Sequence, residues 1–275
     1  MKTSNTAKTF YFIAAVLITL VFLFPLVWML FTAVKPESEA MTYPPTMFPT
    51  EWIWQNFASA WTSQPFTRYT FNTVLVSFFN ILGQLIAGSL AAYGFARYEF
   101  KGKNILFGLL LASMMLPWDV TVIPQYMQFS ALGWIDTFYP LVVPALFGSA
   151  YYIYLMRQYI EQISNEYAEA ARIDGAGELQ TYAQIYMPII RPILSLVVIQ
   201  TLLTVWNDYL GPLVFLNSRN NYTLALGLAS FKGVHTNAIV PTMAIAVVMT
   251  IIPIIVYLLA QRQIVEGMTE GGVKG

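Results

Sequence analysis

The chain has 275 residues, of which 57% are hydrophobic and only 10% are charged, against roughly 25% charged residues in an ordinary soluble domain. This composition predicts an integral membrane protein. The formal net charge is zero and no basic tract occurs, which excludes nucleic-acid binding. The chain has no cysteine and one histidine, so disulfides and thiol chemistry are excluded, and we expect no metal site.

Six apolar stretches approach or exceed the ~20 residues that a helix needs to cross a bilayer. The first is longer than a signal-peptide core and no small-residue cleavage site follows it, so we expect it to remain as a span. We therefore expect an all-α integral membrane fold in one transmembrane domain over residues 1–275, with spans at about residues 10–34, 69–96, 104–129, 137–156, 189–216 and 239–261.

Lysine and arginine are concentrated on one face of this topology. The opposite face carries only Lys35, Arg68, Arg219 and Lys232 of the 14 Lys and Arg residues. Positive charge near short loops is retained in the cytoplasm. We therefore expect cytoplasmic N- and C-termini and a cytoplasmic loop at about residues 161–187.

The most polar part of this loop, residues 169–176, predicts a short helix. Ser164 or Asn165 can cap its start by accepting an otherwise unpaired amide hydrogen, and Gly175 can end it. We expect Glu169 and Arg172 to pair at i,i+3.

One face of this helix is expected to be flat, since its members recur at helical spacing and two of them are alanines. That face comprises Tyr167, Ala170, Ala171 and Asp174. It fits a groove on another protein, and a turn at Asp174-Gly175 can lead into a second helix. Spacing alone leaves open the alternative, a solvated loop with an incidental helix.

Several short motifs occur within this loop and on both sides of it. They are Glu169-Ala170-Ala171, Asp174-Gly175-Ala176, Ile185, Pro188, Pro192, Ala91–Arg97, Phe100–Lys103, Trp206–Asp208 and Gly271–Gly275. The loop motifs resemble the so-called EAA signature of binding-protein-dependent ABC importer permeases, and the other motifs are similar to the carbohydrate branch, in particular to the smaller of the two maltose-type permeases. The likeness covers essentially the whole chain, with Ser164 in place of a frequent proline and Met187 in place of a usual leucine.

This resemblance implies a type I ABC importer permease fold with a cytoplasmic coupling helix, in a bacterial-type plasma (inner) membrane. In the family, the EAA loop docks into a cytoplasmic ATPase, and ATP-driven closure of two ATPases rocks a permease pair from inward-facing to outward-facing. The residues that match this loop are Glu169, Ala170, Ala171, Asp174 and Gly175. The tail after Gln261 resembles a tail that reaches the ATPase interface in maltose-type permeases.

The resemblance also implies partners for this chain. They are a second homologous permease subunit, two ABC ATPase subunits, an extracytoplasmic solute-binding protein, a sugar substrate, such as an oligosaccharide, and membrane lipid. No Gly-x-x-x-x-Gly-Lys-Ser/Thr phosphate cradle occurs in the chain. We therefore expect no enzymatic activity and no cofactor in this subunit, with ATP and Mg²⁺ used by the separate ATPases.

Polar residues at membrane depth are candidates for the solute pathway, because an unpaired charge there is costly and usually faces a cavity or a partner. Asp119 lies between two prolines that interrupt the third span. Trp206, Asn207 and Asp208 can hold a sugar by ring stacking and hydroxyl hydrogen bonds. A structural contact at the permease interface is the alternative for these three residues.

Other functions remain open from the sequence. A permease of the same architecture can carry a polyamine, phosphate or sulfonate, although Ala91–Arg97 and Gly271–Gly275 favour sugar. An ion-coupled carrier would use Asp119 and Asp208 as proton or sodium sites, but inverted repeats and paired broken helices are not evident. A membrane-embedded enzyme would need a nucleophile–base or metal constellation, and the spans contain none.

Overall fold

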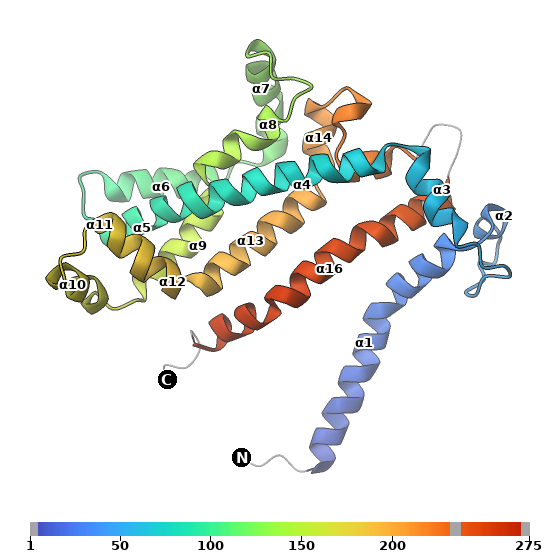
Figure 1. Ribbon diagram of the computed structural model, residues 1–275, viewed down its shortest axis with the longest axis horizontal. Coiled ribbons are helices and arrows are strands. Elements are labelled where there is room, and N and C mark those ends of the chain that lie inside the picture. Colours follow the sequence, from blue (N-terminus) through green and yellow to red (C-terminus); the bar gives the residue numbers. More distant parts are fainter. Residues whose placement is uncertain (1–4, 232–237, 271–275) are drawn as a thin grey trace. The chain divides into compact units, whose positions relative to one another are not determined.

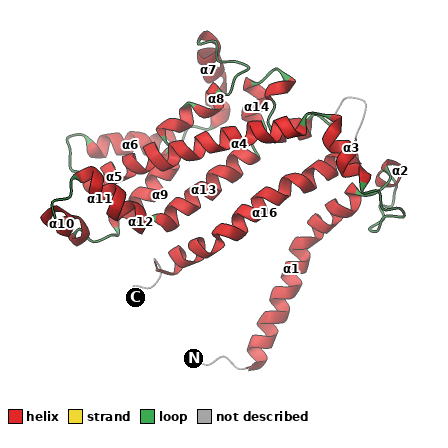
Figure 2. Cartoon of the chain, in the orientation of Figure 1, coloured by secondary structure: helices red, strands yellow, loops and turns green. Residues whose placement is uncertain are grey.

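The computed structural model describes residues 5–231 and 238–270. Within these ranges the chain is helical and contains no strand (Figures 1 and 2). The chain divides into two compact units. The first comprises residues 1–67 and 227–252, and the second comprises residues 68–226 and 253–275. The expectation of one domain over residues 1–275 stays a prediction.

Among the described residues, four helices are long and apolar enough to cross a membrane: Lys8–Ala33, Phe66–Arg97, Tyr139–Glu161 and Ile239–Leu259. Two further helix pairs pass the same test together but are bent, by 98° for Lys103–Ser113 with Trp118–Ala131 and by 77° for Glu178–Ile189 with Arg191–Trp206. If each bent pair is one span, the count is the expected six.

The third and fifth spans differ from the continuous stretches expected from hydropathy. Helix α6 (Lys103–Ser113) ends before Pro117, and α7 (Trp118–Ala131) begins after it. Proline lacks the amide hydrogen and cannot continue a helix without strain, yet Pro124 lies inside α7. The expected fifth span at 189–216 is also split, because α13 (Arg191–Trp206) ends before a separate short helix, α14 (Leu210–Phe215).

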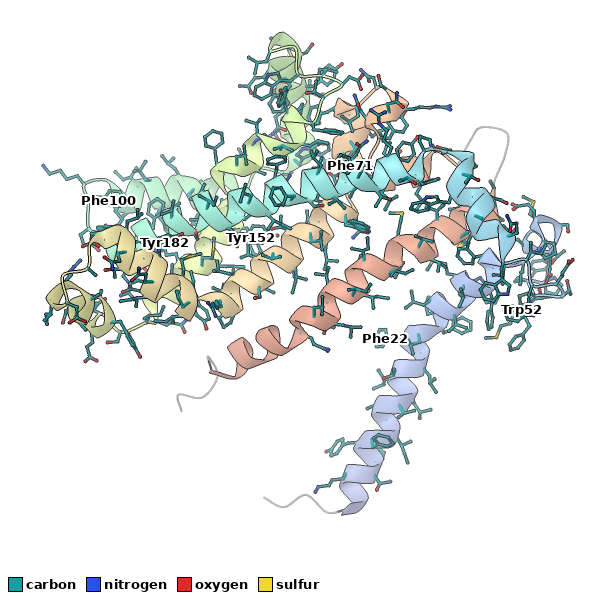
Figure 3. All side chains as sticks on the ribbon, viewed as in Figure 1. Phe22, Trp52, Phe71, Phe100, Tyr152 and Tyr182 are labelled. Atoms are coloured by element: carbon teal, nitrogen blue, oxygen red, sulfur yellow. The ribbon has the colours of Figure 1, made fainter. Side chains whose placement is uncertain are left out.

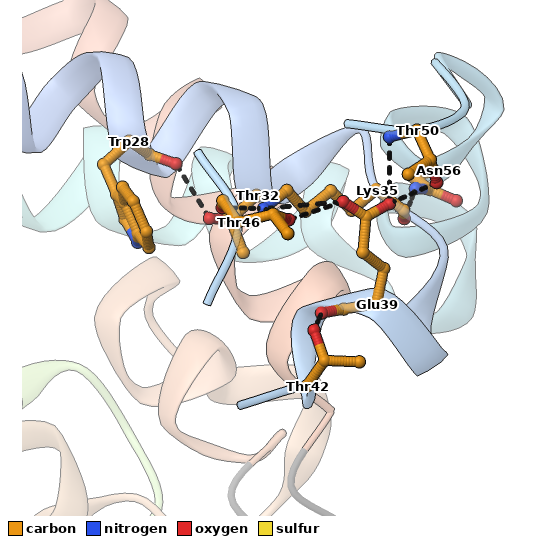
Figure 4. A network of polar contacts seen from close by, with 8 residues as sticks. All are labelled: Trp28, Thr32, Lys35, Glu39, Thr42, Thr46, Thr50 and Asn56. Carbon is orange, nitrogen blue, oxygen red and sulfur yellow. Dashed lines mark hydrogen bonds and ion pairs between the residues drawn. The ribbon is translucent and has the colours of Figure 1, made fainter. Parts of the chain in front are cut away.

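The first unit contains α1 (Asn5–Ala33), α2 (Glu37–Ala40), α3 (Gln55–Ser63) and the beginning of α16 (Ile239–Glu270). A network of hydrogen bonds and one ion pair follows α1 in this unit (Figure 4). The Lys35 amine, with the residue only 2% exposed, donates to the Thr46 carbonyl and to Thr46 Oγ1 (3.0 Å), and lies 3.8 Å from the Glu39 carboxylate. We call the contacts among Lys35, Glu39, Thr46, Thr50 and Asn56 the cap network.

Glu39 is the acceptor at the centre of the cap network. Its carboxylate accepts hydrogen bonds from Thr46 Oγ1 (2.7 Å), Thr50 Oγ1 (2.7 Å) and the Thr50 amide (3.0 Å). The Thr46 and Thr50 bonds, with the Lys35 charge, lower the pKa of Glu39 from 4.5 to about 2. Asn56 Nδ2 completes the network by donating to the Lys35 carbonyl (2.9 Å).

The second unit contains the long second span, made of α4 (Phe66–Gly83), the π-helical turn η1 (Gln84–Gly88) and α5 (Ser89–Arg97). Alongside lie α9 (Ala150–Glu161) and α13 (Figure 1). Its remaining elements are α8 (Tyr139–Val142), η2 (Pro144–Phe147), α10 (Glu166–Ile173), α11 (Glu178–Thr181), η3 (Tyr182–Tyr186), α12 (Met187–Ile189) and η4 (Arg219–Asn221), while α15 (Leu224–Ala229) straddles the division.

A core of buried side chains holds α5, α9 and α13 against the segment that follows α10. Met156, Ile160, Tyr186 and Val197 are fully buried in it. The Tyr93 ring lies 5.0 Å from the ring of Tyr186 and 5.3 Å from that of Tyr182, which is labelled in Figure 3. Aromatic pairs at such separations add to the stabilisation from apolar burial.

Candidate functional site

The polar loop after α9 folds into the expected short helix, α10. Ser164 Oγ accepts a hydrogen bond from the Glu166 amide at 3.3 Å, so Ser164 acts at its start. Asn165, the alternative, makes no side-chain cap, since its Oδ1 instead accepts a hydrogen bond from the Arg97 guanidinium.

Gly175 ends α10 in the way that the sequence predicts. Its φ of +82° lies in the left-handed region that favours glycine. The Gly175 amide donates to the Arg172 carbonyl (3.1 Å), and the Ala176 amide donates to the Ala171 carbonyl (2.9 Å). These two bonds form a Schellman motif, which satisfies the last carbonyls of the helix and turns the chain sharply.

The expected pairing of Glu169 with Arg172 is wrong. Arg172 instead donates from Nη2 and Nε to the Glu178 carboxylate, at 3.0 and 3.2 Å. The Tyr98 hydroxyl donates to the other oxygen of Glu178 at 2.8 Å. The turn at Gly175 brings the start of α11 back beside α10, so Glu178 reaches Arg172 while Glu169 lies exposed.

Ionisation follows these contacts. The hydrogen bond from Tyr98, followed by that from Arg172, lowers the pKa of Glu178, and the bond to Glu178 raises the pKa of Arg172. Burial, followed by the hydrogen bond to Glu178, raises the pKa of Tyr98. The three side chains therefore favour an ionised carboxylate between a neutral phenol and a cation.

The expected flat face of α10 is also corrected. Ala171 is only 5% exposed and packs inward, whereas Tyr167, Ala170 and Asp174 are exposed. Adjacent helical residues lie about 100° apart, so Ala170 and Ala171 do not share a surface here. Sequence reasoning missed the apolar side chain on the opposite side, Ile173, which is 86% exposed, and Leu179 on α11, which is 74% exposed.

Arg97, the last residue of α5, fixes the start of residues 164–189, which we call the coupling segment. Its Nη2 donates to the carbonyls of Ile160 and Ile163, both at 2.6 Å, and its Nη1 donates to Asn165 Oδ1. Its guanidinium carbon lies 4.8 Å from the centre of the Tyr186 ring, a cation–π distance. One side chain thus joins the end of α5 to the end of α9 and to the residue before α10.

Arg97 and Tyr98 contact residues that precede and follow α10 in the chain, and we call this pair the clamp. Arg97 contacts Asn165 before α10, and Tyr98 contacts Glu178 at the first residue of α11. In the sequence, Arg97 is visible only as the end of a family motif. A guanidinium at the end of a span, which carries five donors, is the signal that could have singled it out.

The residues predicted to line a pathway differ in burial and in their hydrogen bonds. Asp119 is exposed in the first turn of α7, directly after the bend in the third span. Trp206 ends α13 and is only 2% exposed. Asn207 Nδ2 donates to the Leu203 carbonyl (2.8 Å), and Asp208 Oδ1 accepts from the Gly211 amide (3.1 Å). No hydrogen bond or ion pair joins Asp119 to Asn207 or Asp208 in the described chain.

A second carboxylate missed by sequence reasoning, Asp136, joins two loops of the second unit. It adopts a left-handed φ of 62°. Its Oδ1 accepts hydrogen bonds from the amides of Asn217 (2.9 Å) and Ser218 (2.8 Å), and its carbonyl accepts one from Asn221 Nδ2 (2.6 Å). Although partial desolvation acts in the opposite direction, bonds from Ser218, Asn217 and Asn221 lower its pKa to about 2. No cluster of three His, Cys, Asp or Glu suited to a metal occurs among the described residues.

Comparison with known proteins places this geometry in a family. Residues 84–270 match the model of the "Binding-protein-dependent transport system inner membrane component". The arabinooligosaccharides transport system permease protein AraQ of Halalkalibacterium halodurans is 31% identical, over 100% of this chain and 99% of its own length. The melibiose/raffinose/stachyose import permease protein MelC of Bacillus subtilis is 32% identical, over 83% of this chain and 84% of its own length.

A solved structure shares the fold. It is from a bacterial ABC transporter involved in the import of the acidic polysaccharide alginate, and the match has a TM-score of 0.81 over 95% of this chain and 99% of that chain, at 22% sequence identity. The family match covers the clamp, α10 and the turn at Gly175, while the motif Gly271–Gly275 lies outside the described residues. The fold is thus that of a type I importer permease, a membrane component rather than a catalytic subunit, which works with a solute-binding protein and an ATPase. The chain belongs to the family of inner membrane components of binding-protein-dependent transport systems.

Proposed function

We propose that this chain is the transmembrane permease subunit of an ATP-driven sugar importer, with an oligosaccharide as its cargo. The relatives named for arabinooligosaccharides and for melibiose, raffinose and stachyose support a sugar. A second, homologous permease supplies the other half of the pathway, and two ATPase subunits use ATP and Mg²⁺. An extracytoplasmic binding protein delivers the sugar. This chain hydrolyses no ATP and binds no cofactor.

The observation that carries this proposal is the two-sided character of α10. Its inner side is held by buried Ala171 and by the clamp, and its outer side presents Ile173, with Leu179 nearby on α11. Covering these two apolar side chains with a partner protein would remove them from water, which is favourable. We assign this surface to the ATPase subunit, and with it place the loop and both termini in the cytoplasm.

Within this interface the matching residues take different roles. Glu169, Ala170 and Asp174 are exposed and available to the ATPase, whereas Ala171 anchors α10 to its own chain and Gly175 sets the turn. Movement of α10 pulls on Arg97 and therefore on α5 and α9, because the guanidinium is bonded to both sides. This is a direct connection between ATPase closure and the spans.

The structure supports one of the candidate residues for the solute pathway better than the other three. Asp119 is exposed at the bend of the third span and remains a candidate for the pathway. Buried Trp206, and Asn207 and Asp208 with their local backbone bonds, favour a structural contact over a sugar site.

The proposal is tested by purifying the tagged chain from its own membranes in a mild detergent and identifying the co-purifying proteins by mass spectrometry. We expect a second permease and an ABC ATPase, whose ATP hydrolysis is stimulated by a sugar-loaded binding protein. Recovery of the chain alone, from a preparation that is folded and active in transport, would overturn the proposal and favour an ion-coupled carrier. Recovery of the partners with stimulation only by a non-sugar solute would overturn the cargo alone.

A further inference from the structure

The second unit contains a cavity of about 310 Å³ that is lined in part by polar side chains and does not include Asp119 or Trp206–Asp208 in its lining. Three spans contribute to it, namely the second, the fourth and the fifth. The residues that matter for its chemistry are Asn80, Gln84, Ser149, Tyr152, Thr201 and Thr204. Tyr152 is labelled in Figure 3. None of the residues that line the cavity is Asp, Glu, Lys, Arg or His.

The walls of the cavity are set by close backbone approach. A Cβ atom at Gly83 would lie 2.2 Å from the Ala145 carbonyl oxygen, and one at Gly148, whose φ is +81°, would lie 2.9 Å from the Gly88 Cα. These contacts bring the π-helical turn η1 against η2 and the start of α9. π-Helical turns inside spans are frequent at functional sites.

Two side-chain amides are fixed at this wall. Gln84 is 3% exposed and its Oε1 accepts a hydrogen bond from the Ser149 amide at 2.8 Å. Asn80 Nδ2 donates to the carbonyls of Val76 and Leu141, both at 2.9 Å. These bonds use the acceptor end of Gln84 and the donor end of Asn80. The Gln84 amide therefore still has N–H donors, and the Asn80 amide still has an oxygen acceptor.

The threonines on the α13 wall differ from others in the spans. The hydroxyls of Thr73 and Thr250 donate to the carbonyl four residues earlier, at 2.9 and 2.8 Å. The Thr201 hydroxyl is buried and has no partner among the described residues. A buried hydroxyl without a partner is unfavourable, and a ligand hydroxyl that bonds to Thr201 would remove this cost. Thr204, one turn later, lines the same cavity and is exposed.

The chemistry of this lining selects a class of ligand. Uncharged hydrogen-bond donors and acceptors suit sugar hydroxyls, which both donate and accept. The Tyr152 ring offers a surface for the C–H face of a sugar ring. Lipid tails cannot satisfy these groups. The volume lies at the low end of the ~300–1,000 Å³ of small-molecule sites, which suits a single sugar ring.

We propose that this cavity is a carbohydrate subsite that this chain contributes to the translocation pathway, holding one ring of a neutral sugar through Gln84, Asn80, Thr201 and Thr204. This inference rests on the proposed function, since it assumes that the cargo is a sugar. The proposed sugar contacts of this subunit are then on the face of α13 that bears Thr201 and Thr204, and not at Trp206–Asp208.

The first test measures occupancy in the assembled importer. The chain has no cysteine, so Thr204→Cys places one thiol in the cavity, and Ser59→Cys places one on an exposed control position. Both variants are treated with a water-soluble maleimide, with and without raffinose or arabinotriose, and labelling of this chain is quantified by mass spectrometry. We expect the transported sugar to slow labelling severalfold at position 204 and not at position 59. No labelling at 204 without sugar, no protection by a sugar that the complex imports, or equal protection at both positions would overturn the subsite.

The second test separates the subsite from the proposed function. Thr201→Val and Thr204→Val each remove a hydroxyl at nearly constant volume, and Thr250→Val is the matched control. We expect raffinose or arabinotriose import, at saturating loaded binding protein, to fall about threefold to tenfold per hydroxyl, while stimulated ATP hydrolysis continues. Unchanged import in both cavity variants would overturn the subsite and leave the importer standing. If the unaltered complex is stimulated only by a non-sugar solute, the proposed cargo fails and the subsite fails with it.

Discussion

The cap network and the coupling segment are both polar, but they are completed in different ways. In the cap network, the amine of Lys35 and the carboxylate of Glu39 find their hydrogen-bond partners within residues 35–56. In the coupling segment, residues 164–189, only the inner side is satisfied by its own chain. Its outer side leaves Ile173 at 86% and Leu179 at 74% exposed.

This difference separates a structural feature from an interface. A network that buries its charge and satisfies each group has no need for a partner. A helix that is anchored on one side and leaves a large apolar side chain exposed on the other gains free energy when another protein covers that side chain. The comparison therefore predicts that changes in the coupling segment alter transport more than stability, and that changes in the cap network do the reverse.

The largest effect is expected from Gly175→Pro. Proline fixes φ near −65°, whereas Gly175 requires +82° and uses its amide in the Schellman motif. We expect the variant to insert normally and to lose more than about a hundredfold in sugar import, measured in proteoliposomes with MgATP and binding protein. Gly177→Ala is the control, because its φ is −74° and a Cβ there meets no atom within 4 Å. Normal import by Gly175→Pro would contradict the role of the turn.

Ile173→Glu tests the exposed side of the coupling segment directly. Placing a charge where an apolar side chain becomes buried removes apolar burial and adds a desolvation cost. We expect affinity for the ATPase subunit to fall about tenfold to a hundredfold, with unchanged thermal stability of the isolated chain. Gln180→Glu adds the same charge at a neighbouring exposed position and should change affinity little. Equal losses in the two variants would mean that Ile173 is not part of a defined interface.

Arg97→Gln tests the clamp. The substitution removes the guanidinium group that donates to the carbonyls of Ile160 and Ile163. Hydrogen bonds from charged groups contribute about 1.5–3 kcal/mol to stability. We expect import to fall about tenfold, with more ATP hydrolysed per sugar, because α10 still binds the ATPase but transmits its movement poorly. Lys101→Gln, which removes an exposed charge in the next loop, is the control. If import and ATP hydrolysis fall in equal proportion, Arg97 serves stability alone.

Tyr98→Phe should have a smaller effect, because Arg172 still holds Glu178. We expect import to fall about twofold to threefold, as is typical for one bond in an exposed network. Loss of the phenol should also raise the pKa of Glu178, since the Tyr98 bond is the main cause of its lowering. That shift is measurable by NMR titration of the carboxyl group. Tyr43→Phe, at a residue 94% exposed, is the control, and an unchanged pKa would exclude this contact.

The smallest effect on transport is expected in the cap network. Because the folded-state pKa of Glu39 is about 2 and its ordinary value is 4.5, its stabilising contribution is present above about pH 4.5 and is lost as the pH falls towards 2. Glu39→Gln should flatten this part of the melting temperature profile and leave import near normal. Glu51→Gln removes an exposed carboxylate as the control. A large loss of import in Glu39→Gln alone would break the comparison between the two regions.

The sequence predicted the elements well where local patterns decide them. Apolar length predicted long helices, which the structure shows at four of the six expected spans, and Gly175 marked the end of α10. It failed where distant segments meet. Glu169 was chosen for Arg172 because it is three residues away, but the return of the chain through Gly177 offers Glu178 instead. Ala171 was assigned to the outer face because spacing on a helix does not reveal which side its own chain covers.

The same limit applies to the site residues, because their partners lie far away in the sequence. Arg97 bonds to carbonyls 63 and 66 residues later in the chain, and no local pattern can identify such partners. Likewise, the cavity needs Gly83, Gly148 and α13 to come together across three spans. The break at Pro117 and continuity at Pro124 show that the same residue type has opposite effects in one span.

The most direct test of the account is the number of sugars imported per ATP hydrolysed, in proteoliposomes that contain the complete importer and receive loaded binding protein. We predict a fixed ratio for the unaltered chain, a lower ratio for Arg97→Gln, and import near background for Gly175→Pro. Sugar uptake that proceeds without ATP, or that keeps the unaltered ratio in both variants, would contradict the claim that α10 and the clamp couple ATP hydrolysis to transport.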